Sequence, residues 1–538
     1  MKNMIIKDMD YILKEAERND PSPRKKKPGA KKAVLPCFLA AAMIAALAAG
    51  CGSGSASGTA DNAGSSAGTA DAGSAVSAGS LDESSAGSTA SALAQAGASS
   101  ALTPEDITIT DTVENNADSE HAITADGENT SYSNTQVIKT GDSDAGDEAD
   151  FYGDNAAIFA SNGAALDLNE MVISTDGTHA NAVFSYGEGT TVNISDSYIE
   201  TSGNCSGGLM TTGGGTMNAE NVTVTTSGNS SAAIRSDRGG GDVNVTGGHY
   251  TTSGVGSPVI YSTADITVDG AYLESTASQG VVVEGANSVT LNDVTLVANN
   301  TTKNGDHSDW HQAVMIYQSM SGDASEGLSS FAMTDGSLTN VTGDVFFITN
   351  TTTTIDLTNV GISNQDPEGI FLRAAAAGWG NEGSNGGQVT LTASDQTIDG
   401  DMIVDEVSAL NLYLTEGSNY TGAINADGTA GEVYVEIGSG STWTLTGDSY
   451  ITALTCDADA IDLNGHTLYV NGEAYTEGTA SEGEAVEMTV SEGGGSDTGM
   501  GMPGDGTPGE QPDGTPPELP DGATPGEPPA GAPGSSQN

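Results

Sequence analysis

The middle of this 538-residue chain repeats itself, between about residues 150 and 475. Each copy has a short apolar pair, a Gly, Asn or Ser turn, an alternating Val-x-Val stretch and a further short stretch that ends near Thr-Ser-Gly. An aliphatic residue recurs in steps of 25, 26, 25 and 26 residues, at Ile158, Val183, Leu209, Ile234 and Ile260. Self-similarity at this period, without helical periodicity, is typical of a solenoid whose units bury their apolar faces only against neighbouring units.

Aliphatic residues two positions apart recur within each copy, as Val192 with Ile194 and Val243 with Val245. Side chains at this spacing point to one face of a strand and would stack, coil on coil, into an apolar column. One repeat is long enough for three short strands and three turns. The sequence therefore predicts an all-β fold, a right-handed parallel β-helix solenoid of about 10–11 coils within residues 104–490. Looser copies begin near Val314, Phe346, Phe371, Ile403 and Val433.

A basic stretch, "KKKPGAKK" (25–32), precedes an apolar one, "AVLPCFLAAAMIAALAAG" (33–50), which ends directly before Cys51. This order predicts a secretory signal over residues 1–50. The small residues before Cys51 resemble the bacterial lipobox, in which a signal peptidase cuts before a cysteine that carries diacylglycerol. The resemblance implies lipidation of Cys51 and a protein anchored at the extracellular face of the cell membrane. The alternative is an uncleaved anchor helix, since an apolar stretch of this length can just span a bilayer.

Two segments have compositions that cannot form a packed core. Residues 51–103 are rich in Gly, Ala and Ser, which predicts a flexible tether. Residues 491–538 are rich in Pro, Gly and acidic residues, which predicts a disordered tail.

The chain is strongly acidic, with a formal net charge of −58. This charge excludes nucleic acid as a partner, because a phosphate backbone needs a basic footprint. So many carboxylates favour weak Ca²⁺ binding without locating a site, and no cofactor is predicted. Beyond Cys51 the basic residues are Lys139, Arg235, Arg238, Lys303 and Arg373.

Three segments interrupt the regular repeat length: "NNTTKNGDHSDWHQ" (299–312), "SMSGDASEGLSS" (319–330) and "AAAAGWGNEGSNGGQ" (374–388). Departures of this kind from the repeat length in a solenoid usually mark loops on the face that binds ligands. Loops before and after the same strand position would rise at opposite edges of one sheet and wall a groove over it.

Two tryptophans lie in these loops, Trp310 and Trp379. A tryptophan in a Gly, Asn and Ser loop can form a platform for a sugar ring, and Arg373 beside the third loop could meet a carboxylate or sulfate. His307 and His311 complete the predicted ligand-binding set. The alternative is that each tryptophan folds over its own coil as a lid.

Two clusters suggest metal ligands without a recognisable motif. In "DHSDWH", His307 and His311 flank Asp309, but the Gly, Asn and Ser neighbours disfavour a helix that would align them, so a solvated loop is the competing interpretation. Asp323 and Glu326 lack any established calcium-loop spacing. No metal site is predicted.

Arg235 aligns in the repeat with aromatic and apolar residues, which alternate with the inward positions. These residues would form an outward stripe. It is either a contact strip or a plain solvent-facing sheet with a local Arg–Asp pair. The other members of the stripe are Phe159, Phe184, Met210 and Tyr261.

Four stretches carry a resemblance to a known group of proteins: "GDEADFYGDNAAIFA" (146–160), "SPVIYSTADIT" (257–267), "MIYQSMSGDA" (315–324) and "STWTLTGDSYITAL" (441–454). The chain resembles secreted right-handed parallel β-helix, pectin-lyase-like surface lipoproteins of Gram-positive gut-type bacteria over about residues 130–475. It resembles the passenger rods of autotransporter adhesins more loosely. The resemblance implies a surface role in adhesion or glycan contact and assigns no catalytic residue.

We therefore expect a lipid-anchored cell-surface β-helix that presents an adhesin-like or carbohydrate-binding face to a glycan or surface protein. One alternative is a polysaccharide lyase or glycoside hydrolase, although Asp399 and Asp401 lack basic neighbours for acid–base work. The other is a structural spacer without a specific ligand.

Overall fold

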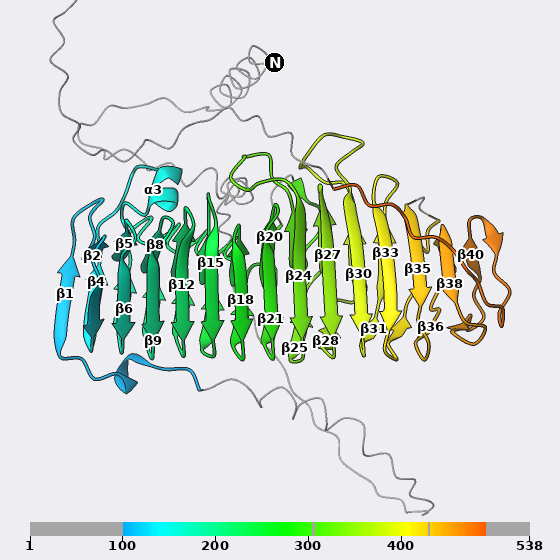
Figure 1. The fold of residues 1–538 in the computed structure, drawn as a ribbon, viewed down its shortest axis with the longest axis horizontal. Coiled ribbons are helices and arrows are strands. Elements are labelled where there is room, and N and C mark those ends of the chain that lie inside the picture. Colours follow the sequence, from blue (N-terminus) through cyan, green and yellow to red (C-terminus); the bar gives the residue numbers. More distant parts are fainter. Residues whose placement is uncertain (1–99, 304–306, 429–430, 491–538) are drawn as a thin grey trace, which may run out of the picture. The chain divides into compact units, whose positions relative to one another are not determined.

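The computed structural model describes residues 100–303, 307–428 and 431–490. The predictions for the signal sequence, for Cys51, for most of the tether and for the tail from residue 491 lie outside these residues. Strands dominate the described chain and stack into three long parallel sheets, which we call A, B and C (Figure 1). The predicted fold class, an all-β parallel β-helix solenoid, is confirmed.

Each of the first ten coils contributes one strand to each long sheet, in the order A, B, C along the chain. Sheet A contains β1 (Asp111–Asn115), β4 (Thr135–Lys139), β7 (Val172–Thr175), β10 (Tyr198–Thr201), β13 (Thr223–Thr226), β16 (His249–Thr252), β19 (Tyr272–Ser275), β22 (Thr295–Ala298), β25 (Ser337–Asn340) and β28 (Gly361–Asn364). Sheet B contains β2 (Ile123–Asp126), β5 (Ile158–Ser161), β8 (Val183–Tyr186), β11 (Leu209–Thr212), β14 (Ile234–Ser236), β17 (Ile260–Ser262), β20 (Val281–Glu284), β23 (Gln312–Tyr317), β26 (Asp344–Thr349), β29 (Ile370–Ala374) and β32 (Asp401–Val404).

Sheet C is the longest, with 13 strands against 10 in sheet A and 11 in sheet B, so the solenoid extends beyond the expected 10–11 coils on this side. Its strands are β3 (Thr130–Ser133), β6 (Ala165–Asn169), β9 (Thr191–Ser195), β12 (Gly215–Glu220), β15 (Gly241–Thr246), β18 (Asp265–Asp269), β21 (Ser288–Asn292), β24 (Leu328–Thr334), β27 (Thr351–Thr358), β30 (Gly387–Ser394), β33 (Ala409–Thr415), β35 (Glu432–Ile437) and β38 (Ala453–Cys456).

Two small sheets and two short helices complete the described chain. Sheet D contains β31 (Thr397–Asp399), β34 (Asn419–Thr421), β36 (Thr442–Thr444) and β39 (Ile461–Asp462). Sheet E contains β37 (Ser449–Ile451), β40 (Leu468–Val470) and β41 (Glu473–Ala474), of which the last two pair antiparallel. The helices are the 3-10 turn η2 (Pro104–Asp106) and α3 (Asp147–Tyr152). No helix in the described part of the chain is both long and apolar enough to cross a membrane.

The strand register follows the repeat in the sequence. The five aliphatic residues of the clear copies pair directly with one another along sheet B, from Ile158 with Val183 to Ile234 with Ile260. Val314 and Phe346 continue this column, followed by Leu372 and Met402, each one residue away from the expected starts near Phe371 and Ile403. A bulge between Ile370 and Leu372 shifts the register where β29 pairs with β32. Val433 lies on β35 of sheet C.

Inward side chains of all three sheets form one continuous core. The alternating pairs Val192 with Ile194 and Val243 with Val245 are at most 2% exposed. Each fully buried aliphatic side chain contributes about 1.5–3 kcal/mol relative to exposure. The core therefore depends on coil stacking, as expected for a solenoid.

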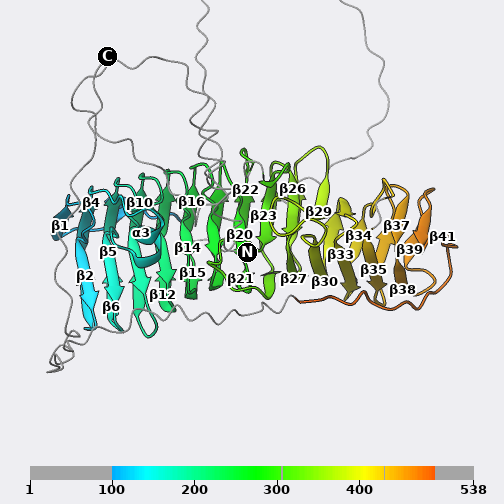
Figure 2. The same cartoon turned by 90° about the horizontal axis from the view of Figure 1, so that it is seen from above.

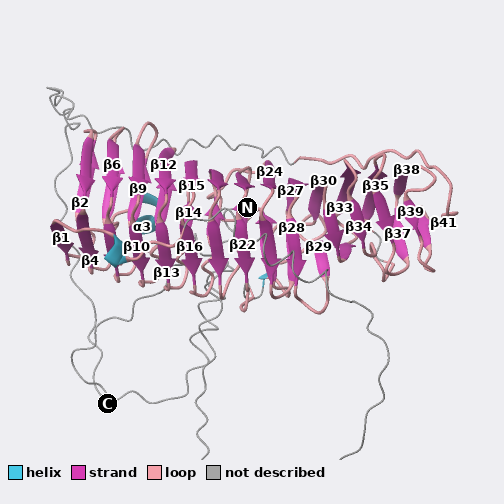
Figure 3. Cartoon of the chain, turned by 90° about the horizontal axis from the view of Figure 1, so that it is seen from below, coloured by secondary structure: helices cyan, strands magenta, loops and turns pink. Residues whose placement is uncertain are grey.

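The chain does not end at the last coil. After β41 it returns along the outer face of sheet C, and we call residues 481–490 the strap; Figure 2 and Figure 3 show it running beside β38, β35 and β30. Asn411 on β33 bonds both the N–H and the carbonyl of Val486 at 2.9 Å. The strap begins with a backbone bridge between Ser481 and Cys456, and beyond it side chains of sheet C bond the strap.

Candidate functional site

The outer face of sheet B is covered. Its outward stripe includes Phe184 and Met210, both 0% exposed, and Arg235, which is 4% exposed. The expectation of a plain solvent-facing sheet is therefore wrong for these residues. One cause is α3, a short helix that the sequence pattern did not predict: Thr212 on β11 donates a hydrogen bond of 2.7 Å to the carbonyl of Phe151 and ties α3 to the sheet.

A buried charge network joins α3 to sheet B. The carboxylate of Asp150 lies 3.3 Å from the guanidinium of Arg235 and 3.1 Å from Nδ1 of His179, and Arg235 also contacts Asp237 at 2.9 Å. Burial alone would raise the pKa of Asp150, but Arg235 and His179 hold it below its ordinary value. Burial raises the pKa of Asp237 to about 7, because Arg235 offsets only part of the desolvation and Asp150 repels a second negative charge.

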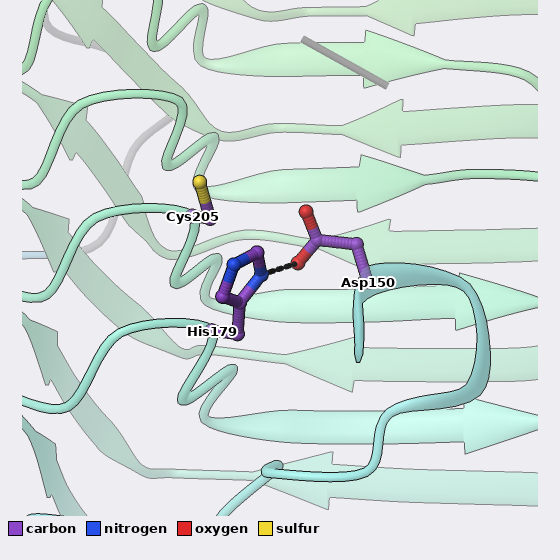
Figure 4. A group of neighbouring side chains, drawn as sticks. All are labelled: Asp150, His179 and Cys205. Carbon is purple, nitrogen blue, oxygen red and sulfur yellow. Dashed lines mark hydrogen bonds and ion pairs between the residues drawn. The ribbon is translucent and has the colours of Figure 1, made fainter. Parts of the chain in front are cut away.

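Asp150, His179 and Cys205 lie close together beside this network. A carboxylate oxygen, an imidazole nitrogen and the cysteine sulfur are within 4.8 Å of one another, and all three residues are buried (Figure 4). The guanidinium of Arg235 contacts the same carboxylate and would repel a cation bound there. The geometry is that of an ion-pair network that fixes α3. His179 and Cys205 are 26 positions apart, one repeat, so the sequence could have placed them together, whereas nothing in it pointed to Asp150.

A second arginine joins α3 to the connection between β23 and β24. Arg238 bonds Asp323 through Nε at 3.0 Å and through NH2 at 2.6 Å, and its guanidinium lies 3.8 Å from the centre of the Phe151 ring. Asp323 is therefore committed to an ion pair. Arginine over an aromatic face, with a two-point bond to a carboxylate, holds both covering segments against the same coil.

A buried carboxyl group lies further along the covered face. Glu284 on β20 accepts hydrogen bonds from the hydroxyl groups of Tyr261 and Tyr317, the latter at 2.8 Å. Burial raises the pKa of Glu284 despite these bonds. Both tyrosines bond the same oxygen, Oε2, in a region where a free charge would be costly, and Oε1 is buried without a hydrogen-bond partner among the described residues.

Two of the three long connections meet above sheet B. His307, in the connection between β22 and β23, accepts a hydrogen bond of 2.7 Å at its carbonyl from the N–H of Gly378, in the connection between β29 and β30. A Cβ atom on Gly378 would lie 2.7 Å from Cα of His307, so glycine is required for this approach. The ring of His307 stacks on Trp379, with 5.1 Å between the ring centres. The loops rise at opposite edges of sheet B, as expected, and touch across it.

The two loop tryptophans differ in exposure. Trp379 is 3% exposed and packs its edge against Tyr317, with ring centres 5.2 Å apart. Trp310 is half-buried and packs on Phe347, with 5.4 Å between the ring centres. Both rings cover the apolar outer face of β23 and β26, which is the arrangement of a lid, and Trp310 keeps part of its surface accessible.

Arg373 lies in the sheet rather than in a loop. It bonds Asp344 through Nε at 2.6 Å and through NH2 at 3.2 Å, and its guanidinium lies 4.6 Å from the centre of the Trp310 ring. Its charge is therefore already matched. His311 is half-buried, and burial together with Lys303 lowers its pKa. Within the described residues, His307, Asp309 and His311 do not converge on a common point where a metal could bind.

Two hollows border the meeting point of the loops and share Gly380 and Val407. The first has a volume of about 610 Å³ and is lined by His307, Ser308, Asp309, Trp310, Ala376, Ala377, Gly378, Gly380, Glu382, Gly383, Asn385, Asp405, Glu406 and Val407. The second has a volume of about 550 Å³ and is lined by Gln318, Ser319, Met320, Glu326, Gly327, Asn350, Thr351, Thr352, Gly380, Asn381, Ser384, Gly386, Gln388, Val407 and Thr489. Polar groups dominate both linings, and Met320, 68% exposed, adds apolar surface to the second.

The carboxylates named as an alternative catalytic pair have structural partners. Asp401 accepts hydrogen bonds from the N–H of Ala423 at 2.8 Å and from the hydroxyl of Thr446 at 3.2 Å, and Asp399 is exposed.

Comparison of the chain with models of known families, with curated proteins and with solved structures found no match.

Proposed function

We propose that this chain is a cell-surface protein, anchored through a lipid on Cys51, that binds a neutral carbohydrate chain at the two hollows beside the connection between β29 and β30. One observation supports this choice above the others. The three longest departures from the repeat gather on one face of an otherwise regular solenoid, around hollows of about 610 and 550 Å³. Ligand sites are concave and are built on loops held by a rigid scaffold.

The lining favours a ligand rich in hydroxyl groups. Carboxylates, amides and main-chain groups line both hollows, and Trp310 offers an accessible aromatic surface to the first. Sugar rings combine an apolar face with hydroxyl groups that donate and accept hydrogen bonds, which suits such a lining.

Charge argues for a neutral rather than an acidic glycan. Of the basic residues in the described coils, Arg235, Arg238 and Arg373 contact carboxylates, and Lys139 is buried against the carbonyls of Ala117 and Gly141. Lys303 is exposed and lines neither hollow. Uronate or sulfate groups would meet mainly carboxylates at the first hollow. An anionic polymer would therefore be repelled unless cations bridged it.

A glycan-array screen of the full chain, run with Ca²⁺ and again with EDTA, tests the proposal. We expect binding to a neutral glycan under both conditions. Ser384→Trp places a bulky side chain at an exposed position of the second hollow and should abolish binding. Ser363→Trp makes the same change at an exposed position of sheet A and should leave binding intact.

Other outcomes separate the alternatives. Release of soluble sugar products from a bound polysaccharide would favour the lyase or hydrolase. If no glycan bound under either condition, the glycan proposal would be wrong, and protein adhesion or a structural spacer would be the alternatives. Equal loss of glycan binding in Ser384→Trp and Ser363→Trp would show that the second hollow is not the binding site.

A further inference from the structure

A second surface with features of a binding site lies on sheet C, away from the loops. A groove of about 530 Å³ crosses β3, β6, β9, β12 and β15, and we call it the sheet C groove. It lies between two columns of outward side chains that follow the strand register along the stacking direction. One column contains Asp167, Asn193, Asn218 and Asn244, and the other contains Asn169, Ser195, Glu220 and Thr246.

The first column is a ladder of amides. Asn193 donates to Asp167 at 2.8 Å, Asn218 donates to Asn193 at 2.9 Å, and Asn244 donates to Asn218 at 3.0 Å. Each amide has two N–H groups and a carbonyl with two lone pairs, and the ladder uses one N–H and one lone pair of Asn218. Donors and acceptors are therefore left over at each step of about 4.8 Å along the groove.

The opposite end of the same face already binds an extended chain. The strap is bonded at every third residue: Gly483 to Thr455, Val486 to Asn411 and Thr489 to Thr352. These partners lie on every second strand, β38, β33 and β27, and each lies one outward column further across the sheet, so the strap crosses the strands obliquely. Three residues of an extended polyproline II chain span about 9.3 Å, and two strand spacings span about 9.6 Å. A polyproline II chain that runs along the stacking axis would therefore meet every second coil at every third residue.

The register connects the strap to the groove. Thr455 belongs to the same outward column as Asn244, through successive pairs on the intervening strands. Asn411 shows what an outward amide does on this face, since it both donates to and accepts from one residue of the strap, at 2.9 Å each. The leftover groups of the Asn ladder offer the same pair of bonds.

The charge of sheet C indicates which kind of partner the groove can bind. The 13 strands of sheet C contain no Lys, Arg or His, and Asp167 and Glu220 line the groove. We infer that the sheet C groove binds a cationic polypeptide in an extended, polyproline II-like conformation, which runs along the stacking axis with its main chain bonded at every second strand, to Asn193 on β9 and Asn244 on β15. Five strands span about 19 Å, which is room for about six residues of such a chain. This inference is independent of the glycan proposal.

Fluorescence anisotropy of a labelled (Ala-Pro-Lys)₄ peptide with the full chain tests the inference. The peptide has the three-residue period, polyproline II propensity and positive charge that the groove requires. We expect saturable binding that weakens with added salt, and no binding of the matched (Ala-Pro-Glu)₄ peptide. Asn244→Ala should weaken binding about thirtyfold, since it removes two hydrogen bonds of about 1 kcal/mol each.

Two matched variants keep the result interpretable. Thr290→Ala changes the same outward column beyond the groove and should leave binding unchanged. Glu220→Lys changes an exposed side chain and should reverse the preference toward the Glu peptide without disturbing the fold. Equal binding of both peptides, or equal affinity of the Asn244→Ala and Thr290→Ala variants, would overturn the inference. Displacement of the peptide by a neutral linear glycan would do the same. Ser384→Trp should not change peptide binding, which separates this site from the glycan hollows.

Discussion

The outer faces of sheets B and C are built on the same coils, yet they have opposite characters. On sheet B, Phe184, Met210 and Phe347 point away from the solenoid core and are still 0% exposed, because α3 and the long connections cover them. On sheet C the outward residues, such as Asn218 and Asn244, are half-buried or exposed. The inward columns specify the solenoid on both sides, so the outward positions and the length of the connections decide what each face can bind.

The two faces also separate charge. Sheet B carries Arg235 and Arg373, each bonded to a carboxylate under cover, whereas sheet C carries no basic residue on its strands. Desolvated ion pairs are tolerated only with matched partners and good geometry. The cover on sheet B supplies one partner, Asp150 on α3, whereas Asp344 lies on β26 and Asp237 directly follows β14. The open face of sheet C has no need of such partners.

Removal of a covered aromatic ring should produce the largest effect. Phe347→Ala takes away a ring that packs on Trp310 and should lower the free energy of unfolding by about 3–5 kcal/mol. Thr290→Ala, at an outward position of sheet C, should change it by less than about 0.5 kcal/mol. Urea denaturation followed by circular dichroism measures both. Similar losses in the two variants would mean that the cover on sheet B adds no packing energy.

The register of the coils could be predicted from the sequence because it depends on a local pattern. Ile158 and Val183 are one repeat apart, and the pairing of one with the other follows from the period alone. The shift at Leu372 could not be predicted, since a bulge changes the count by one residue without changing the apolar pattern. The same repeat could have shown that Asp344 and Arg373 lie on adjacent strands of sheet B.

The covering of sheet B by α3 and the long connections could not be predicted from the sequence pattern, for a physical reason. The helix α3 has six residues, too few to show a helical period, and its key contact joins Asp150 to Arg235 across 85 positions. The contact between His307 and Trp379 spans 71 to 72 positions and depends on the shapes of two irregular loops. The sequence did indicate which segments depart from the repeat, but not that two of them close on each other.

Titration of the covered charge network should produce an intermediate effect. The pKa of Asp237 is about 7 in the folded chain, above the ordinary value of about 3.9, so the folded state holds this proton more tightly than the unfolded state. Its contribution to stability is fully present below about pH 4 and is lost as the pH rises to 7. The Asp237→Asn variant has no carboxyl group at this position, so its stability does not fall as the pH rises. Its free energy of unfolding should therefore increase relative to that of the native chain by on the order of 2 kcal/mol between pH 5 and 7.5.

Urea midpoints of the two proteins at several pH values test this expectation. Glu284 and Asp344, whose pKa values burial also raises, are present in both proteins and cancel in the difference. The pKa of Asp150 is lowered, so its contribution changes below about pH 4, outside this range. A difference that does not change with pH would show that Asp237 is ionised throughout, and that the cover admits enough water to solvate it.

The smallest effect is expected on sheet C, where a few bonds hold the strap. Asn411→Ala removes both bonds to Val486, and each is worth about 1 kcal/mol, so hydrogen exchange at the Val486 amide should accelerate about tenfold or more. The free energy of global unfolding should change little, because the strap adds no inward side chain to the core. Thr392→Ala, on the neighbouring strand of the same face, should leave the exchange rate unchanged. If the strap exchanged slowly in the Asn411→Ala variant too, contacts other than the amide pair would hold it. The comparison of a covered sheet B with a lightly bonded sheet C would then need revision, since sheet C would also carry a firmly packed layer.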